Sequence, residues 1–106
     1  MADRKLGDVA TRVLFENDRV RVWEMDLAPG ESSDVHEHAL DYVLVQLEGD
    51  KIAGIFEPDT HGAYPPGTVE GEVAPGNAIF IGRGGIETAK NTGTKRYREI
   101  LVELKE

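Results

Sequence analysis

Two histidines separated by one residue, His36 and His38, are the side chains best suited to chemistry in this sequence. On a β-strand alternate side chains share a face, so both imidazoles are expected to point the same way. Two imidazoles on one face can ligate a single metal ion if further ligands converge from elsewhere in the chain. Taken alone, the pair is more often two solvated histidines, and the acidic, serine-rich run over residues 31–34 favours that interpretation. The neighbouring segments are therefore needed to distinguish a metal site from two solvated histidines.

The elements that would hold these histidines are short β-prone segments separated by turn residues. The chain has no sustained 3.6-residue period and no capped apolar segment, so helices are not expected. About eight strands in one chain favour a rolled double sheet, because rolling leaves few unpaired edges. The sequence therefore predicts an all-β fold, with strands over residues 11–16, 19–28, 41–48, 51–56, 68–73, 78–81, 86–90 and 96–104.

Size and composition indicate a single domain. The chain has 106 residues, too few for two ordinary domains. We expect a flexible N-terminal segment over residues 1–10, which are mostly polar, and one domain over residues 11–106. The chain has no cysteine, which excludes disulfide scaffolds, thiolate zinc sites and thiol nucleophiles.

The charge balance points away from two classes of partner. The sequence has 12 Lys and Arg against 20 Asp and Glu, a formal net charge of −8. This acidic protein would repel phosphate backbones and anionic lipids, so we expect neither nucleic acid nor membrane partners. No apolar run reaches the about 18 residues of a membrane span, and the first residues lack the apolar core of a signal peptide. A cytoplasmic location is the resulting expectation.

Two spaced segments carry a resemblance to a known family. The segment from Gly30 through His36 and His38 to Gly49 is similar to the first cupin motif, G-x5-H-x-H-x3-E-x6-G, at every spacing. The segment over residues 76–91 resembles the second motif, G-x5-P-x-G-x2-H-x3-N, and follows in the expected order. The chain is thus identified as a member of the cupins. The resemblance implies a small, single-domain double-stranded β-helix, or jelly-roll barrel.

The metal ligands that the cupin motifs carry are altered in this chain. Tyr42 stands where the first motif has its glutamate, and Glu87 stands where the second has its histidine. The resemblance then implies a ligand set of His36, His38 and Glu87, with Tyr42 at the fourth position. Two imidazoles and one carboxylate can form a facial triad for a divalent ion such as Fe, Mn, Ni or Zn. The alternative is a metal-free barrel in which His36 and Glu87 share a proton.

Three other side chains are candidates for contacts with a ligand in the barrel. Tyr42 is expected in the pocket wall or beside the metal ligands, because a phenol with an ordinary pKa of about 10 is costly to ionise. Gln46 shares the strand face of Tyr42 and would either orient a ligand or simply end its strand. Trp23 is expected in the core or in the pocket wall.

Three polar residues lie in expected turns or loops. His61, in the long loop over residues 58–67, is expected to be exposed, or else to belong to a lid over the barrel mouth. Arg83 is expected in a solvated turn, with contact to an anionic ligand as the alternative. Asn91 is expected to tie down its turn.

An apolar strand face points towards an interaction with a second subunit. Val43, Val45 and Leu47 face away from Tyr42 on the same predicted strand. Such a face is unfavourable in water, so another sheet of the chain or a partner subunit is expected to cover it. The hypothesis is a homodimer.

These observations together predict a small cupin that binds a divalent metal ion in its barrel and acts on a small polar molecule. Dioxygenase, isomerase and lyase chemistry all fit such a site, and the fold does not choose among them. The alternative is a non-catalytic or metal-free cupin that only binds a small ligand.

Overall fold

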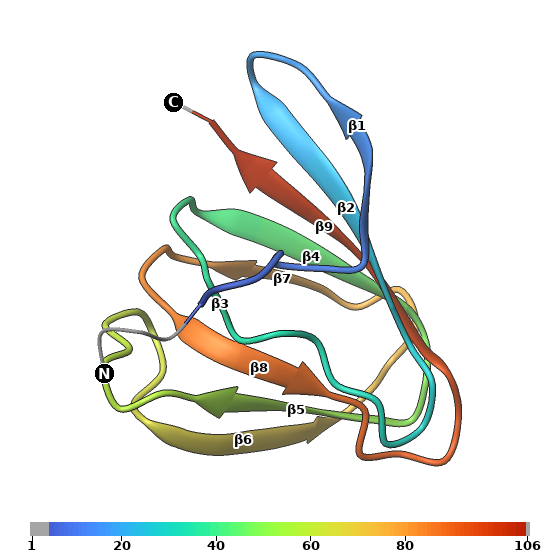
Figure 1. The fold of residues 1–106 in the computed structure, drawn as a ribbon. Helices are drawn as coiled ribbons and strands as arrows, with labels where there is room; N and C mark the ends of the chain where they lie inside the picture. The colour runs from blue at the N-terminus through green and yellow to red at the C-terminus, as the bar shows by residue number, and fades with distance from the viewer. Residues whose placement is uncertain (1–4, 106) are drawn as a thin grey trace.

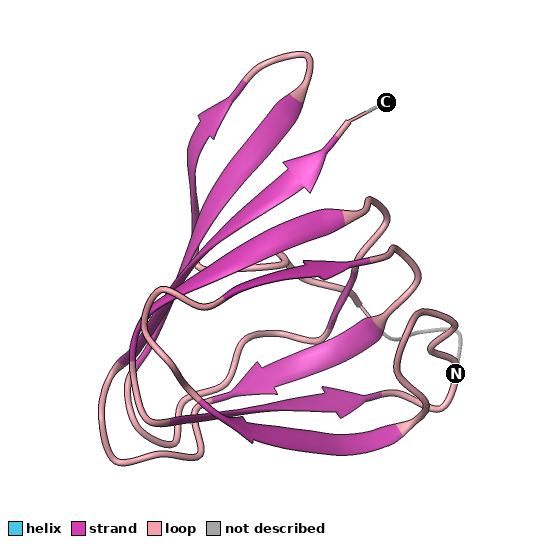
Figure 2. Ribbon diagram, turned by 180° about the vertical axis from the view of Figure 1, so that it is seen from behind, coloured by secondary structure: helices cyan, strands magenta, loops and turns pink. Residues whose placement is uncertain are grey.

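The structure, a computed structural model, describes residues 5–105. These residues form nine β-strands joined by loops (Figures 1 and 2). That range contains no helix, and so none with the length and apolar character to cross a membrane. The all-β prediction is confirmed, and the eight predicted segments differ from observed strands by at most one residue at either end. The strands are β1 (Arg12–Glu16), β2 (Val20–Leu27), β3 (His36–Glu37), β4 (Tyr42–Glu48), β5 (Lys51–Phe56), β6 (Gly67–Glu72), β7 (Ala78–Ile81), β8 (Ile86–Lys90) and β9 (Tyr97–Leu104).

Two antiparallel sheets face each other across the interior. One sheet has five strands in the order β1-β2-β9-β4-β7, and the other has four in the order β3-β8-β5-β6. In Figure 1 the five-stranded sheet lies above the four-stranded one, and loops join the two layers. Strands distant in sequence pair closely, since β2 and β9 stay in register from Val20 opposite Leu104 to Leu27 opposite Tyr97. This arrangement is the predicted rolled double sheet.

The inner face of the five-stranded sheet carries most of the core. Along β9 the burial alternates strictly: Tyr97, Glu99, Leu101 and Glu103 are buried, and the residues between them are half-buried. Alternate side chains of a strand point to opposite faces. The inner face of β9 therefore mixes apolar residues with two carboxylates, and these carboxylates lie inside the barrel.

The hydrophobic core begins before the first strand. Val9 and Ala10 are buried and pack in one cluster with Met25 and Leu27 of β2. The N–H of Gly7 donates to the carbonyl of Val35 at 2.8 Å. Residues 1–4 of the expected flexible segment lie outside the described residues. The expected domain over residues 11–106 therefore omits Val9 and Ala10, two residues of the core.

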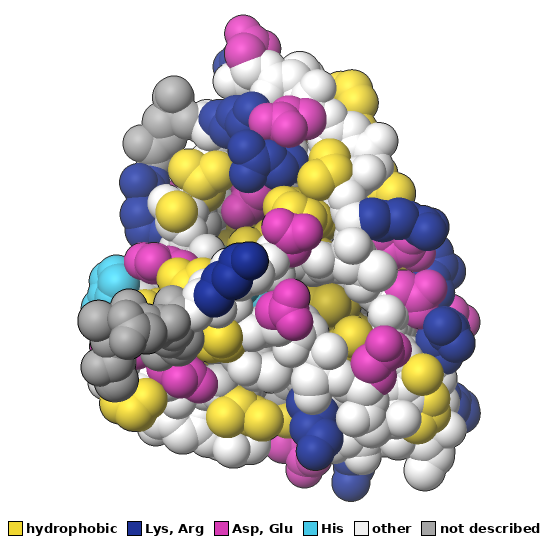
Figure 3. Space-filling view, in the orientation of Figure 1, with side chains coloured by type: hydrophobic (Ala, Val, Ile, Leu, Met, Phe, Trp, Pro, Cys, Tyr) yellow, Lys and Arg dark blue, Asp and Glu magenta, His cyan; other side chains and the backbone are white. Residues whose placement is uncertain are grey.

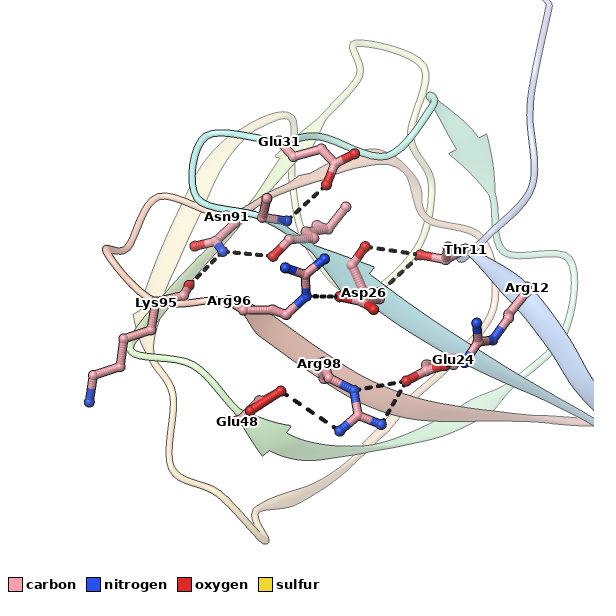
Figure 4. Close-up of polar contacts among 12 residues, drawn as sticks. Thr11, Arg12, Glu24, Asp26, Glu31, Glu48, Asn91, Lys95, Arg96 and Arg98 are labelled. Carbon is pink, nitrogen blue, oxygen red and sulfur yellow. Dashed lines mark hydrogen bonds and ion pairs between the residues drawn. The ribbon is translucent and has the colours of Figure 1, made fainter.

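An ion-pair network covers part of the outer face of the five-stranded sheet (Figure 4). Arg98 Nε of β9 donates to Glu24 Oε2 of β2 at 2.8 Å, and Arg12 of β1 pairs with the same carboxylate. Arg98 also lies 3.7 Å from Glu48 of β4. Glu24 is only 3% exposed, so two guanidinium groups compensate its charge where it is buried.

Asn91 fixes the turn after β8, as predicted (Figure 4). Its Nδ2 donates to the carbonyls of Leu27 at 3.0 Å and Lys95 at 2.8 Å, and its Oδ1 accepts from the N–H of Gly93 at 2.9 Å. The side chain is completely buried. All its polar groups serve this turn and its connection to β2.

The surface mixes charges of both signs. On the face that Figure 3 shows, acidic and basic side chains are interspersed, with hydrophobic side chains between them. The excess of acidic residues is therefore not gathered into one region on that face.

Candidate metal centre

Three of the predicted ligands converge between two neighbouring strands. His36 of β3 lies directly opposite Glu87 of β8 in the antiparallel pair, which Figure 1 shows side by side. Glu87 Oε2 is 3.1 Å from His38 Nε2 and 3.6 Å from His36 Nε2. One ligand atom from each of the three side chains lies within 4.8 Å of the other two. The pairing of β3 with β8 thus produces the geometry that the two motifs predicted.

A glycine-containing turn keeps His38 in line with His36. Beyond the end of β3, the N–H of His38 donates to the carbonyl of Gly85 and the N–H of Gly84 donates to the carbonyl of His38, both at 2.8 Å. Gly84 has φ of +111°, a conformation that favours glycine, and a Cβ there would lie 3.0 Å from the carbonyl oxygen of His61. The extended pairing therefore continues to His38, and both imidazoles enter the interior.

The tautomer of His36 is set by its backbone partner. Its Nδ1 lies 2.8 Å from the carbonyl oxygen of Asp34, which can only accept, so Nδ1 carries the proton. Its Nε2 is then a lone-pair acceptor, and this buried atom has no hydrogen-bond partner among the described residues. A buried polar atom without a partner costs free energy. An imidazole held at Nδ1 by a carbonyl, with Nε2 free, is the usual arrangement of a metal-bound histidine.

His38 is held by its ring contacts. Its ring stacks on Tyr42 with centroids 4.1 Å apart and planes 20° apart, and it meets the His36 ring edge-on at 4.8 Å. Both rings are buried, at 1% exposure or less. Because neither ring can turn away, Nε2 of each stays directed towards Glu87.

Glu87 is ionised at neutral pH. Burial raises the pKa of its carboxyl, but the hydrogen bonds and charges of His36 and His38 outweigh this effect and lower the pKa to about 2. A carboxylate must be deprotonated to ligate a metal. His38 Nε2 donates to this carboxylate, so binding an ion there would displace that proton. Two imidazole nitrogens and one carboxylate oxygen would then form a donor set that fits a divalent ion.

Tyr42 lies beside this centre as a neutral phenol. Burial, followed by the negative charge of Glu87, raises its pKa well above the ordinary range. The residue is 3% exposed and lines the interior cavity. It supports the ring of His38 and forms part of the cavity wall.

The cavity adjoining the three ligands lies between the two sheets and has a volume of about 230 Å³. His38, Tyr42, Gln46 and Glu87 all line it. Gln46 lies inside the barrel, as its strand face predicted, and its Oε1 accepts from the N–H of Ala74 at 3.2 Å. The volume is below the about 300–1,000 Å³ of sites for drug-sized ligands, so the cavity suits a compact molecule.

Trp23 does not line this cavity. Its side chain packs in the hydrophobic core, and its Nε1 donates to Glu103 Oε1 at 2.7 Å. Trp23 was expected either in the core or in the pocket wall, and the structure places it in the core. The prediction that it contacts a bound ligand is therefore corrected. Buried Glu103 satisfies the indole N–H, which leaves Trp23 no polar group to offer a ligand.

The other polar candidates lie at the surface. The side chain of His61 is 64% exposed, and its Nε2 is 3.7 Å from Glu37 Oε2. Arg83 donates to Asp41 Oδ1 from its backbone N–H at 2.9 Å and from Nε at 3.2 Å. Tyr64, from the same loop as His61, lines the cavity and packs against Phe56 at 5.2 Å between ring centroids. That loop therefore closes one side of the cavity through Tyr64.

Sequence reasoning missed two cavity residues on β9. Tyr97 and Glu99 both line the cavity and are buried. The hydroxyl of Tyr97 donates to Glu99 Oε1 and accepts from Gln46 Nε2 at 3.4 Å. Both share a strand face with Leu101, but the opposite face of β9 is more apolar, so the sequence pattern gave no signal for them.

Gly54 provides room for the Glu87 carboxylate. A Cβ at Gly54 would lie 2.7 Å from Glu87 Oε1, at the end of a flexible side chain, and 2.9 Å from Cε1 of the Phe56 ring. We expect Gly54→Ala to leave the fold intact, to displace this carboxylate, and to weaken divalent metal binding by about tenfold. The control is Gly71→Ala on the paired strand β6, where a Cβ meets nothing within 4 Å. Calorimetric titration of both variants checks this, and equal affinities would contradict it.

The jelly-roll fold is that of a small cupin, the class that the sequence motifs predicted. The family model described as Auxin binding protein matches residues 5–105, and the chain belongs to this cupin-type family.

Individual relatives agree with this assignment. Auxin-binding protein 1 of Arabidopsis thaliana is 28% identical over 94 residues, which are 89% of this chain and 46% of that protein. The chain thus spans about half the length of this curated relative. A solved cupin domain from Bordetella pertussis Tohama I has a TM-score of 0.77 at 22% identity, covering 97% of this chain and 98% of that one. A cupin superfamily protein from Desulfitobacterium hafniense DCB-2 has a TM-score of 0.64 at 18% identity, covering 98% and 84%. These likenesses confirm the jelly-roll fold.

Proposed function

We propose that this protein holds a divalent metal ion with His36, His38 and Glu87 and binds a small polar molecule in the adjoining cavity. One observation carries the proposal: the buried Nε2 of His36, without a hydrogen-bond partner among residues 5–105, is directed towards an ionised carboxylate and a second imidazole. An ion at this position would give that atom a partner and balance the negative charge of Glu87.

The surrounding residues divide the work of such a site. The carbonyl of Asp34 keeps His36 in the metal-binding tautomer, and the Tyr42 ring keeps His38 in place. A bound divalent ion supplies Lewis-acid chemistry and, if it is iron, redox chemistry with oxygen. Gln46 presents an amide to the cavity and is placed to orient a ligand. Dioxygenase, isomerase and lyase activities all remain compatible with these roles.

The relative's name supports a small organic ligand. The Arabidopsis protein is named for binding auxin, and this chain matches 46% of its length. We extend from that name only the class of partner, a small molecule. The cavity of about 230 Å³ is in keeping with a compact one.

Metal analysis of protein purified without a histidine tag tests the proposal. We expect near-stoichiometric divalent metal, or a rise in melting temperature on adding Mn²⁺, Ni²⁺ or Zn²⁺ to metal-free protein. An ion at 100 times its dissociation constant stabilises the folded state by about 2.7 kcal/mol. Protein that contains no metal and whose melting temperature ignores all three ions would contradict the proposal. That result would favour the metal-free ligand-binding cupin.

We further propose that the outer face of the five-stranded sheet pairs with a second copy of the chain. A row of apolar side chains crosses all five strands in register: Phe15, Val22, Val102, Val43 and Phe80. Phe15 is 54% and Phe80 62% exposed, an unfavourable arrangement for an isolated subunit. Light scattering at micromolar concentration should give twice the chain mass of 11.6 kDa, and a mass of one chain would contradict this proposal.

A further inference from the structure

The interior cavity has an unbalanced charge. Three carboxylates line it, those of Glu72, Glu87 and Glu99, and no Lys or Arg is among the described residues that do. His36 and His38 face Glu87, but Glu99 has no such cationic partner in direct contact. The β9 side of the cavity is therefore negative when Glu99 is ionised.

A chain of hydrogen bonds fixes the direction in which Glu99 can interact. The N–H of Ala74 donates to Gln46 Oε1, so the amide nitrogen of Gln46 faces the hydroxyl of Tyr97. That hydroxyl accepts a hydrogen bond from Gln46 and donates one to Glu99 Oε1. Glu99 is the last acceptor in this series of hydrogen bonds. Its second oxygen receives no hydrogen bond from the residues that the structure describes.

The environment of Glu99 opposes an unpaired negative charge. The residue is 6% exposed. The pKa of its carboxyl is raised to about 7, mainly by burial. The hydrogen bond from Tyr97 and the charge of His36 lower this pKa, and the charge of Glu87 raises it. A buried carboxylate in this state gains stability from a hydrogen-bond donor that also carries positive charge.

Aromatic side chains line the same cavity. Tyr42, Tyr64, Tyr97 and Phe56 all lie in its wall. The faces of aromatic rings attract organic cations, and their bodies bury apolar carbon. A carboxylate together with aromatic walls is the combination that recognises an organic ammonium group.

We propose that Glu99, Tyr97 and Gln46 form a binding subsite for the ammonium group of a compact organic amine. The amine donates to the carboxylate of Glu99, and its carbon frame packs against the aromatic wall. The subsite depends on the proposed ligand cavity but not on a metal ion, so its test is made on metal-free protein. Failure of metal binding and failure of amine binding are then separate results.

The test is an NMR titration of the metal-free protein with benzylammonium chloride, with sodium benzoate as the anion of similar shape. We expect benzylammonium to bind saturably and at least about tenfold more tightly than benzoate. Glu99→Gln preserves the shape and the acceptor for Tyr97, and should weaken benzylammonium binding by about tenfold. Glu70→Gln, which removes one charge from the exposed strand β6 outside the cavity lining, should bind within about twofold of the unmodified chain.

The pH dependence provides a second measurement. Benzylammonium stays protonated between pH 6 and 8, so its affinity should rise over that range as Glu99 ionises and should stay flat in Glu99→Gln. The titratable groups that face Glu99 are Tyr97 on its own strand, Tyr42 on β4, Glu87 on β8 and His36 on β3, and both proteins retain them. Equal affinity of benzylammonium for both proteins, equal binding of benzoate, or no saturable binding to the unmodified chain would overturn the proposal.

Tyr97→Phe tests the positioning role of the hydroxyl. Without its hydrogen bond the pKa of Glu99 should rise, since that bond lowers it. We expect the rise of benzylammonium affinity to shift to higher pH while the affinity at the high-pH limit falls less than in Glu99→Gln. An unchanged pH midpoint would contradict the hydrogen-bond chain as the device that holds Glu99.

Discussion

Replacement of Glu87 by alanine is expected to weaken the binding of divalent ions by at least about 100-fold, because it removes the one anionic ligand of the site. His36 and His38 would remain as two neutral nitrogen donors without a carboxylate to balance the charge of the ion. Glu87→Gln keeps the volume and removes the charge, so it should lose nearly as much affinity. Isothermal titration with Mn²⁺ and Zn²⁺ measures both.

The matched control is Glu37→Ala. Glu37 adjoins His36 on β3, its side chain is 38% exposed, and it faces away from the centre towards His61. Its removal changes the net charge as Glu87→Ala does but should change metal affinity by less than about threefold. Similar losses in the two variants would show that general charge, rather than the ligand position, attracts the ion.

Replacement of Glu99 by glutamine is expected to stabilise the protein at pH 8 and to leave its stability at pH 4 nearly unchanged. The pKa of Glu99 is raised mainly by burial, from 4.5 to about 7. Between these values the unfolded chain releases the proton that the folded chain keeps, so the stability of the unmodified chain falls as pH rises through this window. The effect is complete above about pH 7, where the folded chain also releases this proton, and it then lowers the free energy of unfolding by about 3 kcal/mol.

Denaturant unfolding of metal-free protein at pH 4, 6 and 8 measures this effect. The difference between Glu99→Gln and the unmodified chain should grow with pH. Glu87 has the opposite dependence, since its pKa is lowered and its stabilisation is lost as pH falls below about 4.5 towards 2. Both proteins keep Glu87, so the difference isolates Glu99. A difference that stays constant from pH 4 to 8 would contradict a buried Glu99 with a raised pKa.

The fold and the three residues of the candidate metal centre could be predicted from local patterns in the sequence. Turn residues mark the ends of the strands because few residue types adopt turn conformations, and eight of the nine observed strands begin and end within one residue of the expected positions. The short strand β3 was not among the expected segments. His36 and His38 point the same way because the spacing of two residues matches the strand period. The position of Glu87 could be predicted because the second motif fixes its spacing in the sequence from the glycines of that motif.

The β9 side of the cavity could not be predicted in this way. Hydrophobic alternation along β9 selects Ile100 and Val102, yet the structure turns Tyr97, Glu99 and Leu101 inwards. Both faces of β9 carry apolar and charged residues, so periodicity alone does not distinguish inside from outside. The pairing of β9 between β2 and β4 decides the question, and that register depends on contacts between segments far apart in the chain.

Trp23 illustrates the same limit of local patterns. Its parity places it on the inner face of β2, and the structure confirms that face. Whether an inner side chain meets the core or the cavity depends on what lies across the barrel. Glu103, on the neighbouring strand, satisfies the indole and holds it in the core.

The most direct test of the metal centre is a crystal structure of the protein loaded with Mn²⁺ or Zn²⁺, with anomalous diffraction recorded at the absorption edge of the ion. We expect one strong anomalous peak inside the barrel, in contact with Nε2 of His36, Nε2 of His38 and the carboxylate of Glu87. A loaded crystal with no peak between these three side chains, or with its ion bound only at the surface, would contradict it.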